Sequence, residues 1–236
     1  MKAVILAAGL GTRLRPITDE VPKCMVQVNG QYIIDRQIEN LLQNNITQSD
    51  IYIIGGYLEN VLYQHLKNKY PHINFISNPR YNETNNMYSL FLAEPFVRGK
   101  EFLLMNADVF YDSHIIKGLL EGEGCKIACD RSQYLDESMK ITLDSEGKIN
   151  HISKKIEESE HYAVSIDVYR ISPKASQILF DEIEDTILNR KDENSWTEIA
   201  LDSIFNRTDF KPYVIADKWF EIDNLEDLKT AERIFK

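Results

Sequence analysis

The opening stretch MKAVILAAGLGTRLRP, residues 1–16, joins an apolar run to a turn that contains two glycines and two arginines. Apart from Lys2, residues 2–7 are apolar and lead into that turn, a pattern that suits a central strand of a parallel sheet. Gly9 and Gly11 let the backbone approach a ligand closely, and consecutive amide groups in such a turn form a concavity that binds anions. Arg13 adds a permanent charge with several donors for phosphate oxygens. The stretch predicts a strand that leads directly into a phosphate-binding loop.

Two common glycine-loop motifs do not fit this turn. A dinucleotide-binding fingerprint would need a third glycine where Leu14 stands, and a Walker loop would need Gly-Lys-Ser/Thr. The plain alternative is a surface turn with Arg13, Arg15 and Lys23 solvated. If the turn does bind phosphate, Lys23 can add a second, compact charge from the far side of the loop.

Beyond this stretch, the first half of the chain alternates between strand-like and helical patterns. Strand-like runs lie at 50–54, 74–77 and 101–105, and helical spacings at 34–45, 59–69 and 87–94. On the helix 59–69 we expect Val61, Leu62 and Leu66 to face inward. The alternation is typical of βαβ units and a mostly parallel sheet.

The second half changes character. Strand-like runs lie at 126–130, 140–143, 149–156 and 162–171, with a turn at 144–147 that predicts an antiparallel hairpin. Helices are expected at 173–189, 196–205 and 225–235, and a short strand at 220–222. Because no linker or repeat interrupts the chain, we predict one domain over residues 1–236, with a small antiparallel part.

Composition narrows the range of partners. The chain has 27 Lys and Arg against 37 Asp and Glu, and its formal charge of −10 works against binding to nucleic acid or to an anionic membrane. The apolar run at the N-terminus is too short to span a bilayer. Cys24, Cys125 and Cys129 lack the spacing of a zinc ribbon, so we expect a reduced, cytoplasmic protein.

Two aspartates stand at strand ends. Asp108 follows the run 101–105, and Asp223 follows the segment 220–222. Two carboxylates brought together at a sheet edge suit Mg²⁺, which prefers oxygen ligands and binds substrate phosphates. The alternative is that each aspartate caps a following segment, since aspartate is a favoured N-cap.

The string LAAGLGTRLRP (6–16) with Lys23 resembles the signature of the nucleotidyltransferases that make sugar nucleotides and CDP-alcohols. PKCMVQVN, IDRQIENL, GGYLENVL and TNNMYSL look like the phosphocholine cytidylyltransferase branch of that family. The resemblance is dense over the first 110 residues or so, thins out afterwards and returns at KWFEIDNLEDL. It implies an α/β fold, a Rossmann-like mixed, mostly parallel sheet flanked by helices. Residues 1–112 would then bind the NTP, and residues 113–236 the acceptor and part of the metal.

The resemblance also implies roles for individual residues. Arg13 and Lys23 would grip the NTP phosphates, and Asp108 and Asp223 would hold Mg²⁺. These four are the predicted catalytic residues. The nucleotide would also contact Leu6, Ala8, Gly9, Gly11, Thr12, Gly56, Tyr57, Asn85, Asn86 and Ser89.

The acceptor pocket is expected in the second half, where the chain departs from the phosphocholine enzymes. Basic residues over a cleft can hold an acceptor phosphate, and a carboxylate or a tryptophan can hold a cationic head. The predicted acceptor residues are Lys140, Lys154, Asp167, Trp219 and Glu221. Strand alternation allows only one of Lys154 and Lys155 to face inward, and we rank Trp196 below Trp219.

We therefore predict an Mg²⁺-dependent enzyme that transfers a cytidylyl group from CTP to a phospho-alcohol or phosphonate by direct in-line displacement of pyrophosphate. Its partners would be CTP and a small phosphate- or phosphonate-bearing acceptor, and a homodimer is left open. Alternatives are a sugar-1-phosphate nucleotidyltransferase that uses UTP, dTTP or GTP, many of which are longer, and a glycosyltransferase. A non-catalytic nucleotide sensor would usually lose Lys23 or an aspartate of the metal pair.

Overall fold

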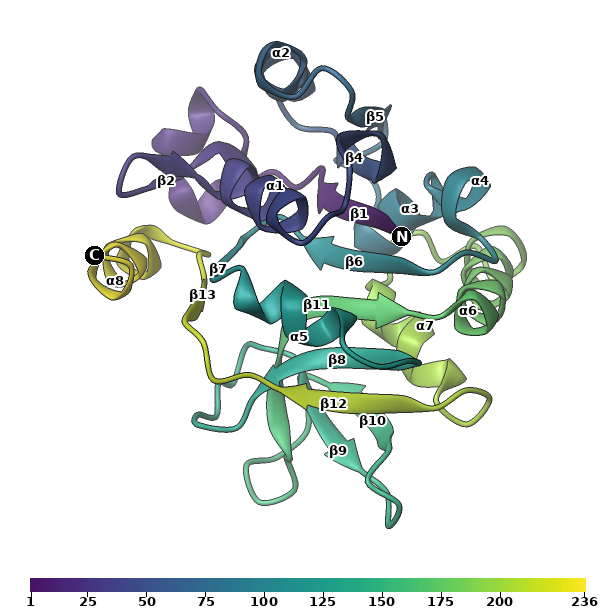
Figure 1. The fold of residues 1–236 in the computed structure, drawn as a ribbon. Helices are drawn as coiled ribbons and strands as arrows, with labels where there is room; N and C mark the ends of the chain where they lie inside the picture. The colour runs from purple at the N-terminus through teal and green to yellow at the C-terminus, as the bar shows by residue number, and fades with distance from the viewer.

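The computed structural model describes residues 1–236 and contains one central sheet (Figure 1). Its strand order is β10-β9-β11-β6-β1-β4-β5, with β8 beside β11 and β12 beside β8. The nine strands are β1 (Lys2–Ala7), β4 (Ile51–Gly55), β5 (Asn74–Ser77), β6 (Phe102–Asn106), β8 (Cys125–Asp130), β9 (Lys140–Leu143), β10 (Ile149–Ser153), β11 (Ala163–Ile171) and β12 (Phe210–Val214). Two small sheets pair β2 (Gln27–Val28) with β3 (Gln31–Tyr32), and β7 (Val109–Tyr111) with β13 (Trp219–Glu221).

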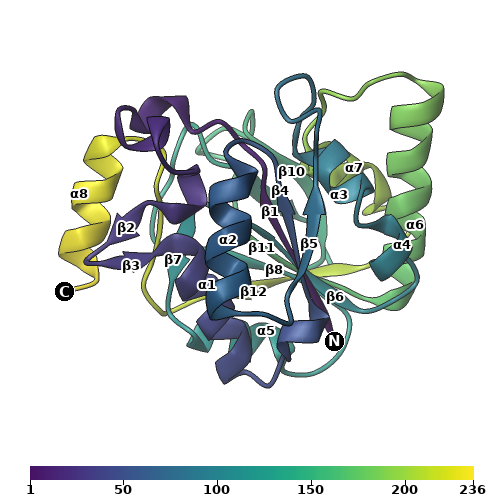
Figure 2. The same cartoon turned by 90° about the horizontal axis from the view of Figure 1, so that it is seen from above.

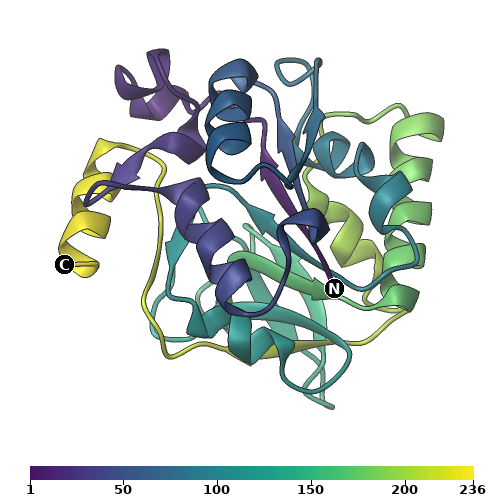
Figure 3. The ribbon, with the colours of Figure 1, turned by 45° about the horizontal axis from the view of Figure 1, so that its top comes forward.

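Helices cover both faces of the sheet (Figure 2). They are α1 (Ile33–Gln43), α2 (Glu59–Lys69), α3 (Asn86–Phe91), α4 (Glu94–Val97), α5 (His114–Leu120), α6 (Pro173–Glu184), α7 (Thr197–Ile204) and α8 (Leu225–Ile234). The C-terminus at the end of α8 lies on the opposite side of the molecule from α6 (Figure 3). No helix combines the length and the apolar character that a membrane span requires.

Strand β1 organises the parallel half. It pairs in parallel with both β4 and β6, which puts Leu6 beside Asn106. Its side chains alternate between two cores, because successive residues of a strand point to opposite faces. Val4 and Leu6 pack with α6 and α7, and Ile5 packs with α1 and α2. Being buried on both faces explains why β1 is a continuous apolar run.

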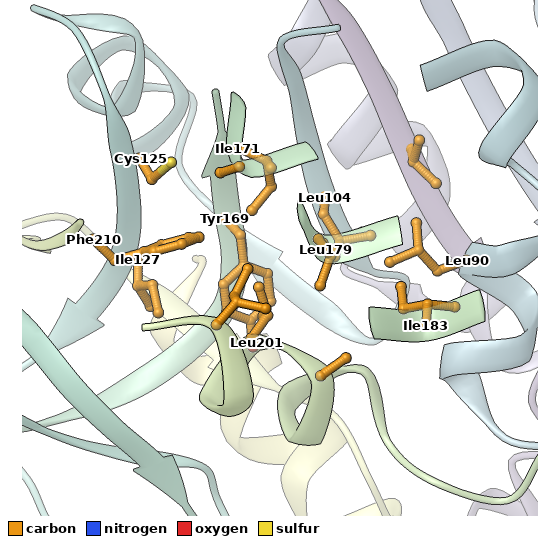
Figure 4. Packing of buried hydrophobic residues seen from close by; sticks show 14 of the residues in the cluster. Leu90, Leu104, Cys125, Ile127, Tyr169, Ile171, Leu179, Ile183, Leu201 and Phe210 are labelled. Carbon is orange, nitrogen blue, oxygen red and sulfur yellow. The ribbon is translucent and has the colours of Figure 1, made fainter. Parts of the chain in front are cut away.

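The antiparallel part is built on β11. This strand pairs antiparallel with β6, β8 and β9, and β9 forms the predicted hairpin with β10. Ile127 and Tyr169 from these strands pack against Leu201 of α7 in the same core (Figure 4). The predicted fold class, a mostly parallel sheet with a smaller antiparallel part, is confirmed. Because β11 bonds directly to β6, one sheet runs through both predicted halves.

Several local predictions were wrong or incomplete. Val61 is 37% exposed, whereas Leu62 and Leu66 are buried, so only two of the three residues on α2 face inward. The sequence patterns also missed β7, α5 and β12. Strand β12 contains Pro212, which removes a backbone donor, and the structure tolerates it because β12 pairs only with β8 at a sheet edge.

Candidate active site

A cleft of about 400 Å³ opens where β1 and β6 end, at the carboxyl edge of the parallel strands. In open α/β sheets this edge is where ligands bind. The predicted residues that line it are Leu6, Ala8, Gly9, Gly11, Thr12, Arg13, Lys23, Asn85, Asn86, Ser89, Asp108, Lys154, Asp167, Glu221 and Asp223. The fold thus brings most of the predicted site residues to one cavity.

The glycine turn needs a glycine at position 11 for two reasons. Gly11 has a φ of 61°, the left-handed region that residues with a Cβ rarely adopt. A Cβ at this position would also lie 2.9 Å from the Cβ of Lys23. The Gly11 carbonyl accepts a hydrogen bond of 2.8 Å from the Thr18 hydroxyl, which fixes the turn from behind.

Lys23 connects the two predicted metal aspartates. Its Nζ lies 2.7 Å from Asp108 Oδ2 and 2.7 Å from Asp223 Oδ1, and Arg13 lies 2.9 Å from the second oxygen of Asp223. We call Lys23 with Asp108 and Asp223 the lysine bridge. Burial opposes the charge on Lys23, but the two carboxylates outweigh it and raise the pKa of the ammonium. Burial also opposes ionisation of Asp223, yet Lys23 and Arg13 together lower its pKa.

Packing beneath the glycine turn explains how Asp223 reaches it. Leu14 and Ile222 are fully buried in one small cluster that also includes Ala231 of α8. The cap of α8 is Asn224, whose side chain accepts hydrogen bonds from the Glu226 and Asp227 amides. The Asp223 carboxylate is therefore not used as a cap and bonds to Lys23 in the lysine bridge.

Helix α1 holds the turn that carries Asp108. The Gln37 side chain is fully buried, and its Nε2 donates to the carbonyls of Asn106 at 2.9 Å and Val109 at 2.8 Å, on either side of Asp108. The Asp108 carbonyl accepts a bond of 2.9 Å from the Ile222 amide. This last bond links the two aspartate segments directly through the backbone.

The acidic group at the cleft fits a hard divalent cation. Asp108, Glu221 and Asp223 each offer a carboxylate oxygen, and these atoms lie within 4.8 Å of one another. Asp108 Oδ1 is buried and has no hydrogen-bond partner. An all-oxygen donor set is the kind that Mg²⁺ prefers. We had predicted an acceptor role for Glu221, but its position is in this acidic group.

Negative charge accumulates around Glu221 in the protein alone. Burial, followed by the charges of Asp108, Asp167 and Asp223, raises the pKa of Glu221 to about 8. A cation bound among these carboxylates would reverse that effect, because it would be the largest local charge.

The predicted nucleotide side has its own supports. Asn85 caps α3 by accepting from the Asn86 amide, and the side-chain oxygen Oδ1 of Asn86 accepts a bond of 2.9 Å from the Thr197 amide of α7. Ser89 accepts a bond of 3.1 Å from Asn78. These contacts tie α3 to its neighbours and present all three predicted side chains to the cleft.

Gly56 and Tyr57 lie outside the cleft lining. A Cβ on Gly56 would come within 2.6 Å of Tyr81 and 2.9 Å of Ala8. The Tyr57 amide donates to the Ala8 carbonyl at 3.1 Å. Both residues therefore pack against Ala8 or Tyr81, next to the glycine turn and outside the lining of the predicted nucleotide site.

Asp167 anchors the other side of the cleft. It interrupts the pairing of β11 with β8 and has a φ of 57°, a conformation that aspartate tolerates better than most residues. Its carboxylate accepts hydrogen bonds from the Tyr169 hydroxyl at 2.8 Å and from Asn106 at 3.0 Å. The same hydroxyl lies 3.0 Å from a Glu198 oxygen, so a single phenol connects two buried carboxylates.

We call Asp167 and Glu198 the acid pair. Burial is the main cause that raises both pKa values, and it is joined at Asp167 by the charges of Glu198 and Asp108. The pKa of Asp167 rises to about 7. A buried carboxylate that lacks a cation is costly, so the acid pair is an arrangement that a positively charged ligand would stabilise.

Lys154 and Trp196 lie near the acid pair. Both line the cleft, and the Lys154 Nζ is 4.9 Å from the centre of the Trp196 ring. Trp196 is 41% exposed, whereas Trp219 is buried and donates its indole N–H to Asp130 at 2.8 Å. The positions of the two tryptophans are thus the reverse of our ranking: Trp196 lines the cleft, whereas Trp219 is a core residue whose indole N–H is bonded inside the fold.

Lys140 is also outside the cleft. Its side chain is fully buried, and its Nζ donates to the carbonyls of Leu135 at 3.3 Å and Asp136 at 2.8 Å. The ammonium cannot reach an acceptor phosphate while it makes these bonds. The prediction of an acceptor contact for Lys140 therefore does not fit its contacts.

Other cleft residues escaped the sequence reasoning. They are Ala7, Cys24, Asn78, Tyr81, Thr84, Asn106, Ala107, Glu137, Ser138, Met139 and Glu198. Glu198 did leave a signal, because it stands among the apolar residues of α7, where a carboxylate needs a partner. Ala7 and Asn106 are the last residues of β1 and β6, and most of the others come from turns and loops whose position in space has no periodic signature.

The comparisons with known proteins agree with this geometry. The family model described as nucleotidyl transferase matches residues 2–234. CTP:phosphoglutamine cytidylyltransferase of Campylobacter jejuni is 29% identical over 97% of this chain and 98% of that enzyme. Choline-phosphate cytidylyltransferase of Streptococcus pneumoniae is 42% identical over 52% of this chain and 49% of that enzyme. Among solved structures, CTP:phosphocholine cytidylyltransferase from Streptococcus pneumoniae superposes with a TM-score of 0.82 at 26% identity, covering 100% of this chain and 99% of the other.

Proposed function

Since the chain belongs to the nucleotidyl transferase family, we propose that it transfers a cytidylyl group from CTP to a small phosphate- or phosphonate-bearing acceptor and releases pyrophosphate. The observation that carries the proposal is the lysine bridge beside Arg13 and the glycine turn. It places two cations and two carboxylates within hydrogen-bond distance at the ligand-binding edge of the sheet. Two relatives that act on CTP and a phosphorylated compound support this choice of nucleotide.

The reaction needs little covalent help from the protein. An oxygen of the acceptor phosphate forms a bond to the α-phosphorus, and the bond to the β-phosphate oxygen breaks, so pyrophosphate leaves with the electron pair. Such an acceptor is already anionic near neutral pH, and no general base is needed. Catalysis then consists of positioning and charge neutralisation.

The chain's own residues supply both the positioning and the charge neutralisation. The glycine turn would offer backbone amides to the phosphates, and Arg13 and Lys23 would offset their charge. Gln37 and the Ile222 amide fix the Asp108 turn, so the charged groups are held in place before substrates arrive. Asp108 and Asp223, with Glu221 beside them, would hold Mg²⁺. When bound there, the ion would neutralise charge on the phosphate oxygens of both substrates.

The acceptor half favours a nitrogen-bearing acceptor. In this half the cleft is lined by several carboxylates, including the acid pair, and by one basic residue, Lys154. A positively charged group would compensate the acid pair and could stack on Trp196. The phosphorylated compounds in the names of the two relatives, phosphoglutamine and choline phosphate, both contain nitrogen.

Pyrophosphate release tests the proposal. The purified protein with Mg²⁺ is incubated with CTP, UTP, dTTP, GTP or ATP against phosphocholine, 2-aminoethylphosphonate, myo-inositol 1-phosphate and glucose 1-phosphate. We expect release with CTP and a nitrogen-bearing acceptor. Release only with glucose 1-phosphate and another NTP would replace the proposal with a sugar-nucleotide enzyme.

A binding measurement completes the test. If no pair reacts and CTP still binds to wild type and to Asp108→Asn with equal affinity, the protein is a nucleotide sensor and the proposal is wrong. The Asp112→Asn variant serves as the matched control, because Asp112 pairs with Arg36 away from the cleft. It should react like wild type.

A further inference from the structure

Lys140 is the residue in the antiparallel part whose burial calls for an explanation. Its side chain is fully buried, yet its hydrogen bonds go to two backbone carbonyls and not to a carboxylate. Lysine is almost never fully buried unless its charge is compensated. The third side of the ammonium faces the Tyr134 ring, whose centre is 4.8 Å away. A site that surrounds a cation with carbonyls and a ring face is built around that cation.

Both carbonyls belong to one loop. Residues 131–139 connect β8 to β9, and the loop contributes Glu137, Ser138 and Met139 to the wall of the cleft. Its two ends are fixed independently of Lys140. Asp130 accepts hydrogen bonds from the Ser132 amide and the Gln133 side chain, and the Ser165 amide donates to the Met139 carbonyl at 2.7 Å.

The middle of the loop depends on Lys140. The Leu135 carbonyl accepts from both the Lys140 ammonium and the Ser138 amide, and the Asp136 carbonyl accepts from Lys140 at 2.8 Å. Tyr134, which covers the ammonium, donates its hydroxyl to the Ile156 carbonyl at 3.2 Å and joins the loop to the segment after β10. Without the ammonium, the two carbonyls would lack a hydrogen-bond donor. Water could replace that donor only if the loop opened.

The position of this loop bears on the acidic group at the cleft. The Ser138 hydroxyl donates to Glu221 Oε2 at 3.3 Å. A loop that opens would withdraw Ser138 from Glu221 and Glu137 from the cleft wall. The nucleotide side would be untouched, because the glycine turn and the residues of α3 are held by other contacts.

We propose that Lys140 is a positioning residue whose buried ammonium latches the 131–139 loop against the cleft and so forms one wall of the acceptor site. This inference rests on the proposed function for the identity of the substrate that the wall contacts. The latch itself is a property of the fold and can be measured without turnover.

The first experiment measures hydrogen exchange in wild type, Lys140→Met and the control Lys155→Met. Methionine keeps the unbranched, apolar stem of lysine and removes the ammonium, and Lys155 is an exposed lysine beside Lys154. We expect amides of the 131–139 loop, that of Ser138 above all, to exchange about tenfold faster or more in Lys140→Met. Peptides from β1 and β6 should be unchanged, and Lys155→Met should match wild type. Equal exchange of the loop in all three proteins overturns the latch.

The second experiment separates the two substrates. Steady-state rates are measured with CTP and whichever of phosphocholine, 2-aminoethylphosphonate and myo-inositol 1-phosphate turns over. In Lys140→Met, the KM for the acceptor should rise about tenfold or more while the KM for CTP stays within about twofold. An unchanged acceptor KM, or an equal rise in both KM values, overturns the role in the acceptor site even if the loop exchanges faster.

Two further arms keep the outcomes distinct. If Lys140→Met does not fold, Tyr134→Leu removes the ring face and the hydroxyl bond to Ile156, whereas the matched Tyr134→Phe removes that bond alone. Both leave the ammonium and its carbonyl bonds, and faster loop exchange is expected in Tyr134→Leu than in Tyr134→Phe. Equal exchange in these two variants would overturn the latch. If wild type turns over no substrate pair, the proposed function fails, and the exchange measurement alone still decides whether Lys140 latches the loop.

Discussion

The two sides of the cleft handle buried charge in opposite ways. On the nucleotide side, the lysine bridge pairs one ammonium with two carboxylates, and Arg13 adds a second cation. On the acceptor side, Asp167 and Glu198 share a tyrosine hydroxyl and have no cation bonded to them. The first arrangement is balanced before any ligand binds, whereas the second becomes balanced only when a positive group arrives. This difference underlies our proposal that the first side binds phosphates and the second side binds the head of the acceptor.

The largest effect is expected from the lysine bridge. Asp108→Asn keeps the size of the side chain and removes its charge, and we expect kcat for pyrophosphate release to fall about a thousandfold. The reason is that a neutral amide cannot balance the charge of Lys23 and is a weaker ligand for a divalent cation than a carboxylate. A loss of less than about tenfold would show that Asp108 has no direct part in the reaction. Asp112→Asn is the control.

A smaller loss of kcat is expected when Gln37, which holds the turn that carries Asp108, is replaced. Gln37→Leu removes the amide that fixes the carbonyls of Asn106 and Val109, so the Asp108 turn should shift by a fraction of an ångström. We expect kcat to fall between about tenfold and about a hundredfold, because misplaced charged groups are costly in a preorganised site. The control is Gln43→Leu, an exposed glutamine on the same helix. Equal kcat values for the two variants would show that Gln37 has no part in positioning Asp108.

The acid pair should affect the KM for the acceptor and not the KM for the nucleotide. Asp167→Asn removes a charge from the acceptor side, and we expect the KM for phosphocholine or 2-aminoethylphosphonate to rise about tenfold, which corresponds to about 1.4 kcal/mol. The KM for CTP should not change. If myo-inositol 1-phosphate, which has no nitrogen, suffers the same rise, Asp167 does not recognise a positive group.

The acid pair should also appear in the pH dependence of stability. Asp167 has a pKa of about 7 in the folded protein, above its value of about 4 in an unfolded chain. Its contribution to the free energy of unfolding is therefore complete below about pH 4 and is lost as the pH rises toward about 7. Asp167→Asn removes this loss.

Urea denaturation at about pH 5 and at about pH 7.5 measures the effect. The free energy of unfolding should fall less between the two pH values in Asp167→Asn than in wild type. Glu198 remains in the variant and its pKa is also raised, so part of the slope should persist. Parallel behaviour of the two proteins would mean that Asp167 is ionised across the range.

The smallest effects are expected from the tryptophans: replacing Trp196 should change the KM for the acceptor, and replacing Trp219 should change stability. Trp196→Leu should raise the KM for a nitrogen-bearing acceptor by about twofold to fivefold, as expected for an exposed cation–π contact. Trp219→Phe should leave that KM unchanged and lower the free energy of unfolding by about 1–2 kcal/mol, because the Asp130 carboxylate loses a donor. The opposite pattern would restore Trp219 to the acceptor site.

The sequence predicted the residues on the nucleotide side of the cleft better than those on the acceptor side. Arg13, Gly11 and Lys23 lie close together in the chain, so a shared phosphate-binding role could be predicted from a short string, and the structure places all three at one cleft. Asp108 could be placed because it closely follows a buried strand. Lys140 and Trp219 lie outside the cleft lining. The sequence could not reveal this, because polarity alone does not say whether a side chain faces the cleft or a polar partner inside the fold.

The sequence by itself determined the strand and glycine turn at the N-terminus, the βαβ alternation and the family. These features depend on local periodicity and on residue types at fixed spacing. Only the tertiary structure decided that Glu221 joins Asp108 and Asp223, that Tyr169 couples Asp167 to Glu198, and that Lys140 is bound to loop carbonyls. Each of these contacts joins side chains from different elements or holds an irregular loop, and their geometry depends on how strands pair and helices pack, which no short stretch of sequence encodes.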